Sequence, residues 1–433
     1  MTVRYTSVNT EAEPLGRSLP FELSGQTAKN RFLKSAMAEC LASWSSTDPT
    51  LVGVPTDEYI NLYKKYGENN WGLIITGQID VDTNLYHMGN VVIGAGHLMQ
   101  GPRFEKFQRL ATVATANGSL LLGQLVHVGR QADVRVSKET IAASAIQLEP
   151  RLGMTFAEPR EATKADIQNV VESFVHAALY LETAGFSGIQ LHAAHGFLLS
   201  NFLARATNHR QDEYGGTLEN RMRLIVEIAD AIKEKVSPNF ILAIKINSVE
   251  FQENGLTPEE AKVLCRTLEE HQFDLIELTG GTFEGLDFDG KRESTQAREA
   301  FFLDFASTIV PVLKKTKSYV SGGFRTVGAM VNALETVDGI GLARPAAQEP
   351  SLPRDILAGK IEGAIKPASA FIQGFHLSVA VAGGQLRQIS TGRDPVDLSN
   401  EELAGKVLAQ LQAWTQTPLE ERPRYGWPTL QLN

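Results

Sequence analysis

The sequence is poor in cysteine, with only two in 433 residues, Cys40 and Cys265. Two cysteines cannot build a disulfide framework, and their positions do not give metal-ligand spacing. A reducing compartment is the simplest context for such a chain, so we expect a cytoplasmic protein.

Long apolar runs are also lacking. No stretch is apolar for long enough to span a bilayer, and the first fifteen residues carry Glu11 and Glu13 but no hydrophobic segment. We therefore expect neither a secretory signal nor a membrane anchor.

Positive charge is not in surplus, because the formal net charge is −9. Nucleic acids and anionic membrane surfaces bind basic faces, so we expect neither of them as a partner. An anionic cofactor would need a local positive pocket instead.

Hydrophobic residues are plentiful, at 43% of the chain, which is enough for a large core. Short aliphatic runs alternate with amphipathic helical patterns, and this alternation favours a parallel sheet covered by helices. About eight such runs occur, the number that a closed barrel requires. The predicted strands are Arg31–Ala38, Gly72–Ile79, Ser119–His127, Gly188–His195, Phe240–Asn247, Leu275–Gly281, Ser318–Gly323 and Gly339–Ala343.

The flanking segments complete the predicted fold. Pro14–Lys29 contains a turn-prone stretch that suits a hairpin lid at the bottom of a barrel. The clearest helices are predicted at Thr163–Ala184, Leu218–Lys235, Pro258–His271 and Arg298–Lys315, with a further helical run at Glu401–Trp414. The sequence thus predicts an α/β fold, a (β/α)8 TIM barrel over residues 1–350. Residues 351–433 are predicted to be a C-terminal extension packed on the barrel, and a homodimer contact there is an open alternative.

Functional residues of such barrels lie at the C-terminal ends of the strands. The fourth predicted strand ends with two histidines, His192 and His195, where the strand gives way to a turn. Neutral imidazoles donate hydrogen bonds, so this pair could hold a carbonyl oxygen and stabilise charge that develops on it. A metal pair and core histidines are the alternatives, and metal is less favoured because no carboxylate or thiolate accompanies the pair.

Two further strands carry polar side chains in apolar surroundings. Gln124 offers an amide that both donates and accepts, which matches the edge of a uracil-like or isoalloxazine ring, although a buried glutamine bonded to backbone is an equal alternative. Lys245 lies inside an apolar strand, and a buried lysine requires an anionic ligand or a carboxylate nearby.

The last two predicted strands each end in a turn that favours phosphate binding. One turn contains Gly322, Gly323 and Arg325, and the other contains Ala343 and Arg344. Barrels commonly build a phosphate site from these two loops, where glycine lets the backbone approach and arginine grips phosphate with two hydrogen bonds.

Together these motifs resemble the Old Yellow Enzyme family, in its fungal or thermophilic-like branch. The resemblance covers the chain from about Leu19 to Pro350. It is carried by the two phosphate turns and by the runs Ser35-Ala36-Met37, Gly123-Gln124-Leu125, His192-Ala193-Ala194-His195-Gly196, Asp212-Glu213-Tyr214-Gly215-Gly216 and Glu219-Asn220-Arg221.

The resemblance implies an FMN-dependent oxidoreductase with NADPH or NADH as hydride donor. In that family the hydride passes through FMN N5 to the β-carbon of a small-molecule activated alkene, an α,β-unsaturated carbonyl compound held by the two histidines. The residues that match the FMN contacts are Ala36, Met37 and Gly77 at the ring, Gln124 at the pyrimidine edge, Lys245 beside N1, and Gly322, Gly323, Arg325, Ala343 and Arg344 at the phosphate.

One position departs from the family pattern. Phe197 stands where the family usually has a tyrosine whose phenol protonates the α-carbon, and phenylalanine has no proton to transfer. Three hypotheses follow: an ene-reductase that takes its proton from solvent or another group, a redox-neutral isomerase or dehydrogenating biosynthetic flavoenzyme, and a flavin-binding protein that has lost productive catalysis.

Overall fold

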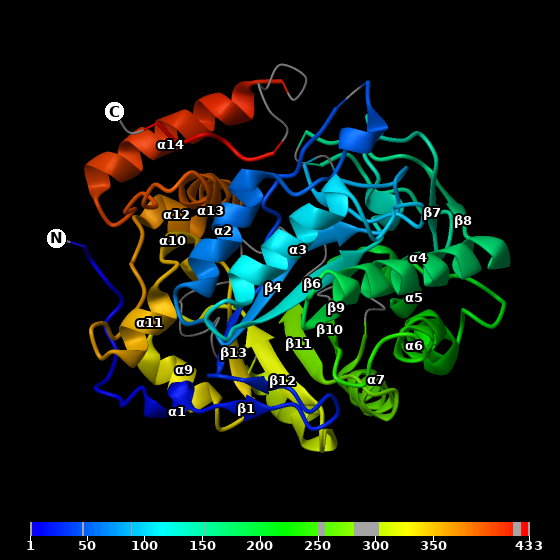
Figure 1. The fold of residues 1–433 in the computed structure, drawn as a ribbon, viewed down its shortest axis with the longest axis horizontal. Coiled ribbons are helices and arrows are strands. Elements are labelled where there is room, and N and C mark those ends of the chain that lie inside the picture. The colour runs from blue at the N-terminus through cyan, green and yellow to red at the C-terminus, as the bar shows by residue number, and fades with distance from the viewer. Residues whose placement is uncertain are drawn as a thin grey trace.

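The computed structural model describes residues 2–45, 47–87, 89–151, 153–249, 256–280, 303–418 and 426–431. In these ranges eight parallel strands close into a barrel, because the first strand pairs with both the last and the second (Figure 1). A short strand, β5 (Val91–Val92), adds to β4. The barrel strands are β3 (Phe32–Lys34), β4 (Leu73–Asp80), β6 (Leu120–Val126), β9 (Gly188–Ala193), β10 (Ile241–Val249), β11 (Leu275–Gly280), β12 (Lys317–Ser321) and β13 (Gly339–Leu342). The predicted (β/α)8 fold is confirmed, and each predicted strand overlaps one of these.

The barrel interior is layered because side chains alternate between the two faces of a strand. An apolar lower layer is formed by Leu33, Leu73, Ile75, Leu122, Ile241, Ala243, Leu275 and Tyr319. Two residues further along the strands, towards their C-terminal ends, the same alternation places a polar layer of Ser35, Gln124, Lys245, Glu277 and Ser321. The polar and charged side chains of this layer therefore lie towards the C-terminal ends of the strands.

The hairpin lid forms as predicted. Strands β1 (Leu19–Pro20) and β2 (Thr27–Ala28) pair antiparallel. Leu19, Phe21 and Ala28 pack into the apolar lower layer. The hairpin thus closes the end of the barrel opposite the polar layer.

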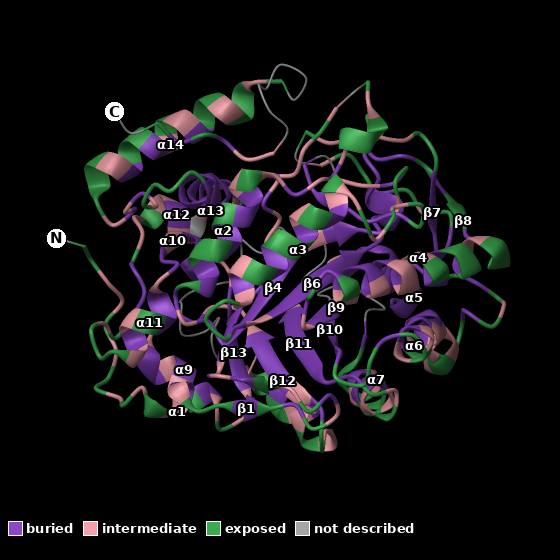
Figure 2. Ribbon diagram, in the orientation of Figure 1, coloured by how far each residue is buried: buried purple, intermediate pink, exposed green. Residues whose placement is uncertain are grey.

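Helices cover the outside of the barrel, with buried faces towards the strands and exposed faces outward (Figure 2). Helices α4 (Lys164–Thr183) and α7 (Pro258–Glu270) each begin with a capping box, which satisfies backbone donors at the helix start. With α6 (Leu218–Lys233), they confirm three predicted helices. The prediction Arg298–Lys315 begins outside the described residues, and its described part is helical at 303–309 and continues as η4 (Val310–Val312).

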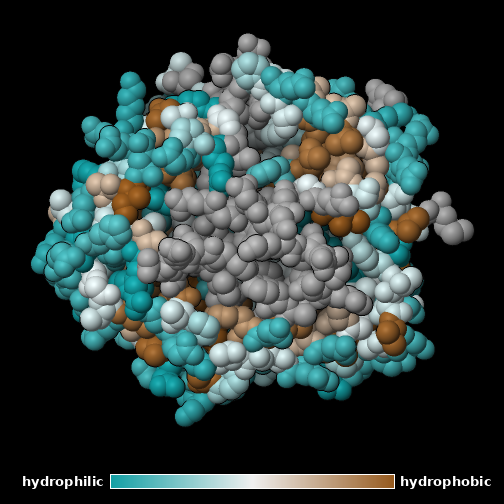
Figure 3. Space-filling view, turned by 180° about the vertical axis from the view of Figure 1, so that it is seen from behind, coloured by the Kyte–Doolittle hydropathy of each residue, from teal (hydrophilic) through white to brown (hydrophobic). Residues whose placement is uncertain are grey.

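The remaining elements lie on the loops and around the barrel. They are α1 (Glu13–Gly16), η1 (Pro49–Leu51), α2 (Asp57–Gly67), α3 (Pro102–Thr115), η2 (Gly129–Gln131), β7 (Thr140–Ala142), β8 (Pro159–Glu161), α5 (Leu198–Leu203), α9 (Val327–Ala333), α10 (Arg344–Gln348) and α11 (Leu352–Leu357). Within the described ranges, no helix combines the length and apolar character that crossing a bilayer requires. Among the described residues seen from behind, hydrophilic side chains predominate, with smaller hydrophobic patches (Figure 3).

The C-terminal part contains α12 (Ser369–Gln373), α13 (Phe375–Ser390) and α14 (Glu401–Gln416). Helix α13 contacts α2 and α10, whereas α14 lies at the periphery beside α13 (Figure 1). A separate hydrophobic cluster joins these three helices to Leu430. The division of the chain at residue 350 and a homodimer contact stay predictions.

Candidate active site

A buried carboxylate organises the polar layer of the barrel. Glu277 on β11 accepts a hydrogen bond from Lys245 Nζ at 3.0 Å and another from Gln190 Nε2 at 2.8 Å. Ser321 also donates to Glu277, and its hydroxyl lies 2.6 Å from that of Ser35. Burial alone would raise the pKa of Glu277, but Lys245 and the donors from Ser321 and Gln190 outweigh burial and hold this pKa below its ordinary value. Glu277 is therefore ionised at neutral pH.

Glu277 is the charge partner of Lys245, whose side chain is almost fully buried. Lys245 was predicted to need an anionic ligand or a carboxylate, and Glu277 is that carboxylate. The sequence could have revealed this partner, because Glu277 also lies inside an apolar strand, but its pairing depends on the register Lys245↔Glu277 between β10 and β11.

Gln124 is bonded to a second glutamine, not to backbone. Its Nε2 donates to Gln190 Oε1 at 2.7 Å, and the two residues are register partners on β6 and β9. Because this bond uses one of the two amide hydrogens, Gln124 keeps a donor and its carbonyl acceptor for a ligand.

Two glycines let neighbouring groups pack closely against the backbone at the mouth of the barrel. A Cβ on Gly77 would lie less than 3.0 Å from Glu39 Oε2 and from Met37 O, and a Cβ on Gly341 would collide with Ser321 Oγ. The backbone N–H of Gly77 donates to Glu39 Oε1 at 2.7 Å and lies 2.9 Å from Tyr63 Oη. Gln124 offers one amide hydrogen and its carbonyl oxygen, and Lys245 supplies a buried cation on β10. These groups fit the edge of an isoalloxazine, which carries both donor and acceptor atoms.

The residues after β3 lie at the same end of the barrel. Ala36 and Met37 are partly buried and pack against the two core clusters. Trp427, near the C-terminus, donates its indole N–H to Ala38 O at 2.5 Å. Gly426 lies so close to Cys40 that a Cβ there would lie less than 3.0 Å from Cys40 Cβ. The tail therefore returns to the segment that follows β3, a contact that the sequence did not predict.

The two predicted phosphate turns lie side by side, because Ser321 on β12 is the register partner of Gly341 on β13. Gly323 has a φ of 82°, a conformation that favours glycine. Arg344 Nη1 donates to Ser378 Oγ on α13 at 2.7 Å, and Arg325 Nη1 donates to Phe324 O at 2.7 Å. The turns are brought together as predicted, and the binding of phosphate there stays a prediction.

The two histidines lie against each other at the end of β9. Their ring centroids are 5.2 Å apart at an interplanar angle of 84°. Ala194 N donates to His192 Nδ1 at 3.3 Å, which leaves the proton of this ring on Nε2 as a donor. His195 Nε2 lies 3.4 Å from Thr279 Oγ1.

Desolvation keeps both imidazoles neutral. Burial, with His195 and then Lys245, lowers the pKa of His192 well below its ordinary value. Burial, with the nearby cation of Lys245, lowers the pKa of His195 to about 3. The pair can therefore donate hydrogen bonds at neutral pH. In the described residues no group of three or more His, Cys, Asp or Glu side chains could hold a metal ion, so the metal alternative gains no support.

Phe197 packs between two imidazoles. Its ring centroid lies 4.7 Å from that of His192 and 5.7 Å from that of His87. His87 Nδ1 lies 3.8 Å from Asp80 Oδ1, and neither atom has a hydrogen-bond partner within the described part of the chain. Sequence reasoning missed His87. A search of the loop after the second barrel strand for titratable side chains would have found it.

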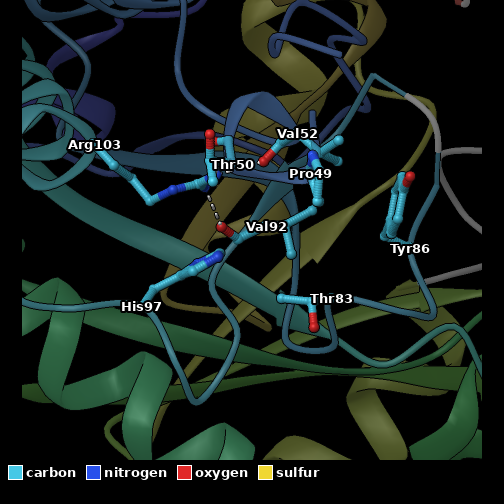
Figure 4. A pocket seen from close by; sticks show the side chains of 8 residues that line it. All are labelled: Pro49, Thr50, Val52, Thr83, Tyr86, Val92, His97 and Arg103. Atoms are coloured by element: carbon cyan, nitrogen blue, oxygen red, sulfur yellow. Dashed lines mark hydrogen bonds between the residues drawn. The ribbon is translucent and has the colours of Figure 1, made fainter. Parts of the chain in front are cut away.

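A separate pocket of about 360 Å³ lies beside η1 and α3 (Figure 4). Arg103 lines it, and its guanidinium donates to four backbone carbonyls, those of Thr50, Val52, Gly53 and Val92. None of the predicted site residues lines this pocket. Its lining residues are Pro49, Thr50, Val52, Thr83, Tyr86, Val92, His97 and Arg103.

This chain is similar to known proteins in sequence and in fold. A model of the NADH:flavin oxidoreductase / NADH oxidase family matches residues 19–360. The NADH-dependent flavin oxidoreductase nadA of Aspergillus parasiticus is 48% identical over 416 residues, which are 95% of this chain and 94% of the relative. The NADH-dependent flavin oxidoreductase iccE of Talaromyces variabilis is 34% identical over 363 residues, which are 77% of this chain and 84% of the relative. The solved structure of morphinone reductase aligns with a TM-score of 0.66 at 22% identity, covering 82% of this chain and 92% of that protein.

Proposed function

Because this chain belongs to the NADH:flavin oxidoreductase / NADH oxidase family, the Old Yellow Enzyme family that its motifs predict, we propose that it reduces the activated C=C bond of α,β-unsaturated carbonyl compounds. The protein is an FMN-dependent oxidoreductase that takes its hydride from a nicotinamide donor. The alkene substrate and the roles of individual side chains are the parts that we propose.

The observation that carries the proposal is the pair of neutral imidazoles beside Lys245. A carbonyl oxygen between His192 and His195 would accept two hydrogen bonds, and these bonds strengthen as the oxygen gains negative charge. Neutral donors hold the enolate-like charge without giving up a proton too early, because both pKa values lie below the neutral range.

The flavin supplies the hydride when it is bound, and this chain supplies the contacts. We assign the ring to Ala36, Met37 and Gly77, the pyrimidine edge to Gln124, and the N1 side to Lys245. The phosphate would be held by the two adjacent turns, through Gly322, Gly323, Arg325, Ala343 and Arg344. The half-free amide of Gln124 and the buried cation of Lys245 support these assignments.

The proton for the α-carbon needs a donor other than Phe197. This ring is buried, with 6% of its surface exposed, and it has no transferable proton. The His87 ring packs against that of Phe197, and its Nδ1 lies 3.8 Å from Asp80 Oδ1. We therefore propose His87, or a water molecule beside it, as the proton donor.

The buried phenylalanine also favours a second candidate function. A substrate that accepts a hydride at the β-carbon but is not protonated becomes an enolate whose former double bond can rotate before the hydride returns, and the net reaction is then a redox-neutral isomerisation. In a dehydrogenation a saturated substrate would instead give its hydride to the oxidised flavin, which would pass it on to NAD⁺ or NADP⁺. This alternative shares the fold, the flavin and the histidine pair with the first.

A steady-state assay separates the two functions. NADH or NADPH consumption that is matched by formation of saturated product from cyclohexenone or a nitroalkene supports the reductase. Flavin reduction by the nicotinamide without alkene turnover, in the same preparation, supports either the second candidate function or a flavin-binding protein that has lost productive catalysis.

Phenol binding tests the role of the histidines separately from turnover. Phenolates that stack on a bound flavin give a long-wavelength absorbance band, and their oxygen would take the place of the substrate carbonyl. We expect the double variant His192→Ala/His195→Ala to bind p-hydroxybenzaldehyde at least tenfold more weakly. His271→Ala is the matched control, because His271 ends α7 and pairs with Asp230 on α6. Equal affinity in all three proteins would remove the carbonyl-holding role.

A further inference from the structure

Side-chain hydrogen bonds join four strands of the barrel at one buried carboxylate, and a fifth strand is linked to it through Gln190. Glu277 on β11 accepts from Lys245 Nζ on β10 and from Gln190 Nε2 on β9. Ser321 on β12 donates to the same carboxylate. Gln190 then accepts a hydrogen bond from Gln124 on β6 at 2.7 Å, so the network reaches the amide that we assign to the flavin edge.

We infer that Glu277 is a positioning residue of the flavin site, which sets the direction of the hydrogen bonds reaching Gln124 and offsets the charge of Lys245. The inference rests on the proposed function only where it places Gln124 and Lys245 against the flavin. It does not depend on which substrate takes the hydride.

The direction of the bonds follows from the charge of Glu277. An ionised carboxylate only accepts, so Gln190 must turn its amide nitrogen towards Glu277. Gln190 then presents its carbonyl oxygen to Gln124, and Gln124 must donate with its own amide nitrogen. A neutral amide at position 277 both donates and accepts. It would therefore no longer fix the direction of the hydrogen bonds from Gln190 to Glu277 and from Gln124 to Gln190.

The charge balance at Lys245 follows from the ion pair. Negative charge that the flavin gains on reduction is stabilised by a nearby cation, and a carboxylate 3.0 Å from that cation weakens its field. With Glu277 in place, the site holds a cation and an anion beside the flavin instead of a lone cation. Glu277 therefore keeps the reduced flavin a stronger hydride donor than Lys245 alone would allow.

A purely structural role does not account for this ion pair. Both side chains are nearly or fully buried, with exposed fractions of 6% and 0%. Buried ion pairs often stabilise a fold no better than apolar side chains of the same size. The apolar layer directly below shows that such side chains pack well in this barrel. Burial together with a specific charge partner at the mouth of a barrel is typical of a functional site.

The midpoint potential of the bound flavin tests the inference in the holoprotein without any alkene. Glu277→Gln keeps the size of the side chain but removes its charge, and we expect the potential to rise by at least 30 mV, which is about a tenfold change in a two-electron equilibrium. The charge-balanced variant Lys245→Met/Glu277→Gln should return to within 10 mV or so of the wild-type potential, by the same relation. Glu277→Asp, which keeps the charge, should also stay near the wild type.

An unchanged potential in Glu277→Gln would overturn the inference. If Glu277→Gln does not retain flavin, the charge-balanced double variant decides. Flavin retention with a near wild-type potential supports the inference, and loss of flavin or a large shift in that variant overturns it. A protein that shows the expected potentials but reduces no alkene would contradict the proposed substrate and leave Glu277 in its positioning role.

Discussion

Substitution of Gly77 by alanine tests whether bare backbone at the mouth of the barrel is required. Gly77 lies in β4 where the pairing with β6 shifts register between Ile75 and Gln78. Its N–H is bonded to Glu39, and Glu39 is also bonded by Tyr63. The position is therefore enclosed by groups that hold one another in place.

The size of the effect follows from what a new methyl group would meet. A Cβ on Gly77 would lie 2.6 Å from Glu39 Cδ, and less than 3.0 Å from Met37 O, which belongs to the backbone. Because backbone cannot swing aside like the end of a flexible side chain, the segment after β3 must shift. Overpacking of this kind costs about 1–3 kcal/mol. A flavin that contacts Met37 and Gly77 would lose a similar amount of binding free energy, so we expect FMN to bind about fivefold to 150-fold more weakly.

Two measurements check the expectation. Denaturant unfolding gives the change in the free energy of unfolding, and titration of FMN fluorescence gives the dissociation constant. Gly96→Ala is the matched control, because a Cβ on Gly96 would meet nothing within 4 Å. We expect this control to behave like the wild type in both measurements.

Equal stability and equal affinity for FMN in Gly77→Ala and Gly96→Ala would contradict the crowding expected at Gly77. Loss of stability without weaker FMN binding would keep the packing argument but would remove Gly77 from the flavin contacts.

Three further predictions concern the residues around Phe197. Folding lowers the pKa of His195 from 6.5 to about 3. As the pH decreases, the imidazole is therefore protonated in the unfolded chain before it is protonated in the folded one. The free energy of unfolding should fall between about pH 6.5 and pH 3, by up to about 1.4 kcal/mol per pH unit. His195→Asn, which tolerates the left-handed φ of 58°, should flatten that fall in denaturant titrations between pH 7.5 and 4.5, and identical slopes would contradict the pKa direction. Phe197→Tyr should speed the oxidative half-reaction with cyclohexenone about tenfold or more in stopped-flow experiments, since a positioned acid contributes about 10²–10⁴-fold, and no gain would mean that another group already donates efficiently. His87→Asn should slow that half-reaction by a similar factor but leave flavin reduction by NADH unchanged, and an unaffected oxidative rate would exclude His87 as the donor.

The order of the barrel strands could be predicted from the sequence because the pattern is local. Each strand is an aliphatic run followed by an amphipathic helix, and the helix starts at Thr163 and Thr257 carry their own capping residues. The hairpin at Leu19–Ala28 was also encoded locally, by its turn. Strand boundaries were predicted less accurately. The first strand was predicted to end at Ala38, but β3 ends at Lys34, where the chain leaves the sheet.

Candidate site residues could be located because barrel chemistry lies at the C-terminal strand ends. The sequence singled out His192, Gln124 and Lys245 in this way, as polar side chains in apolar strands, and His195 as a histidine directly after one. What each of them contacts could not be predicted, because those contacts join strands that are far apart in sequence.

Sequence alone determined which side chains face the inside of the barrel, since alternation along a strand is fixed by backbone geometry. Tertiary structure decided the rest. The register between β10 and β11 gave Lys245 its partner Glu277, loop conformation brought His87 to Phe197, and the returning tail placed Trp427 on Ala38. Each of these contacts depends on how distant segments pack, and no local pattern of residues encodes that packing.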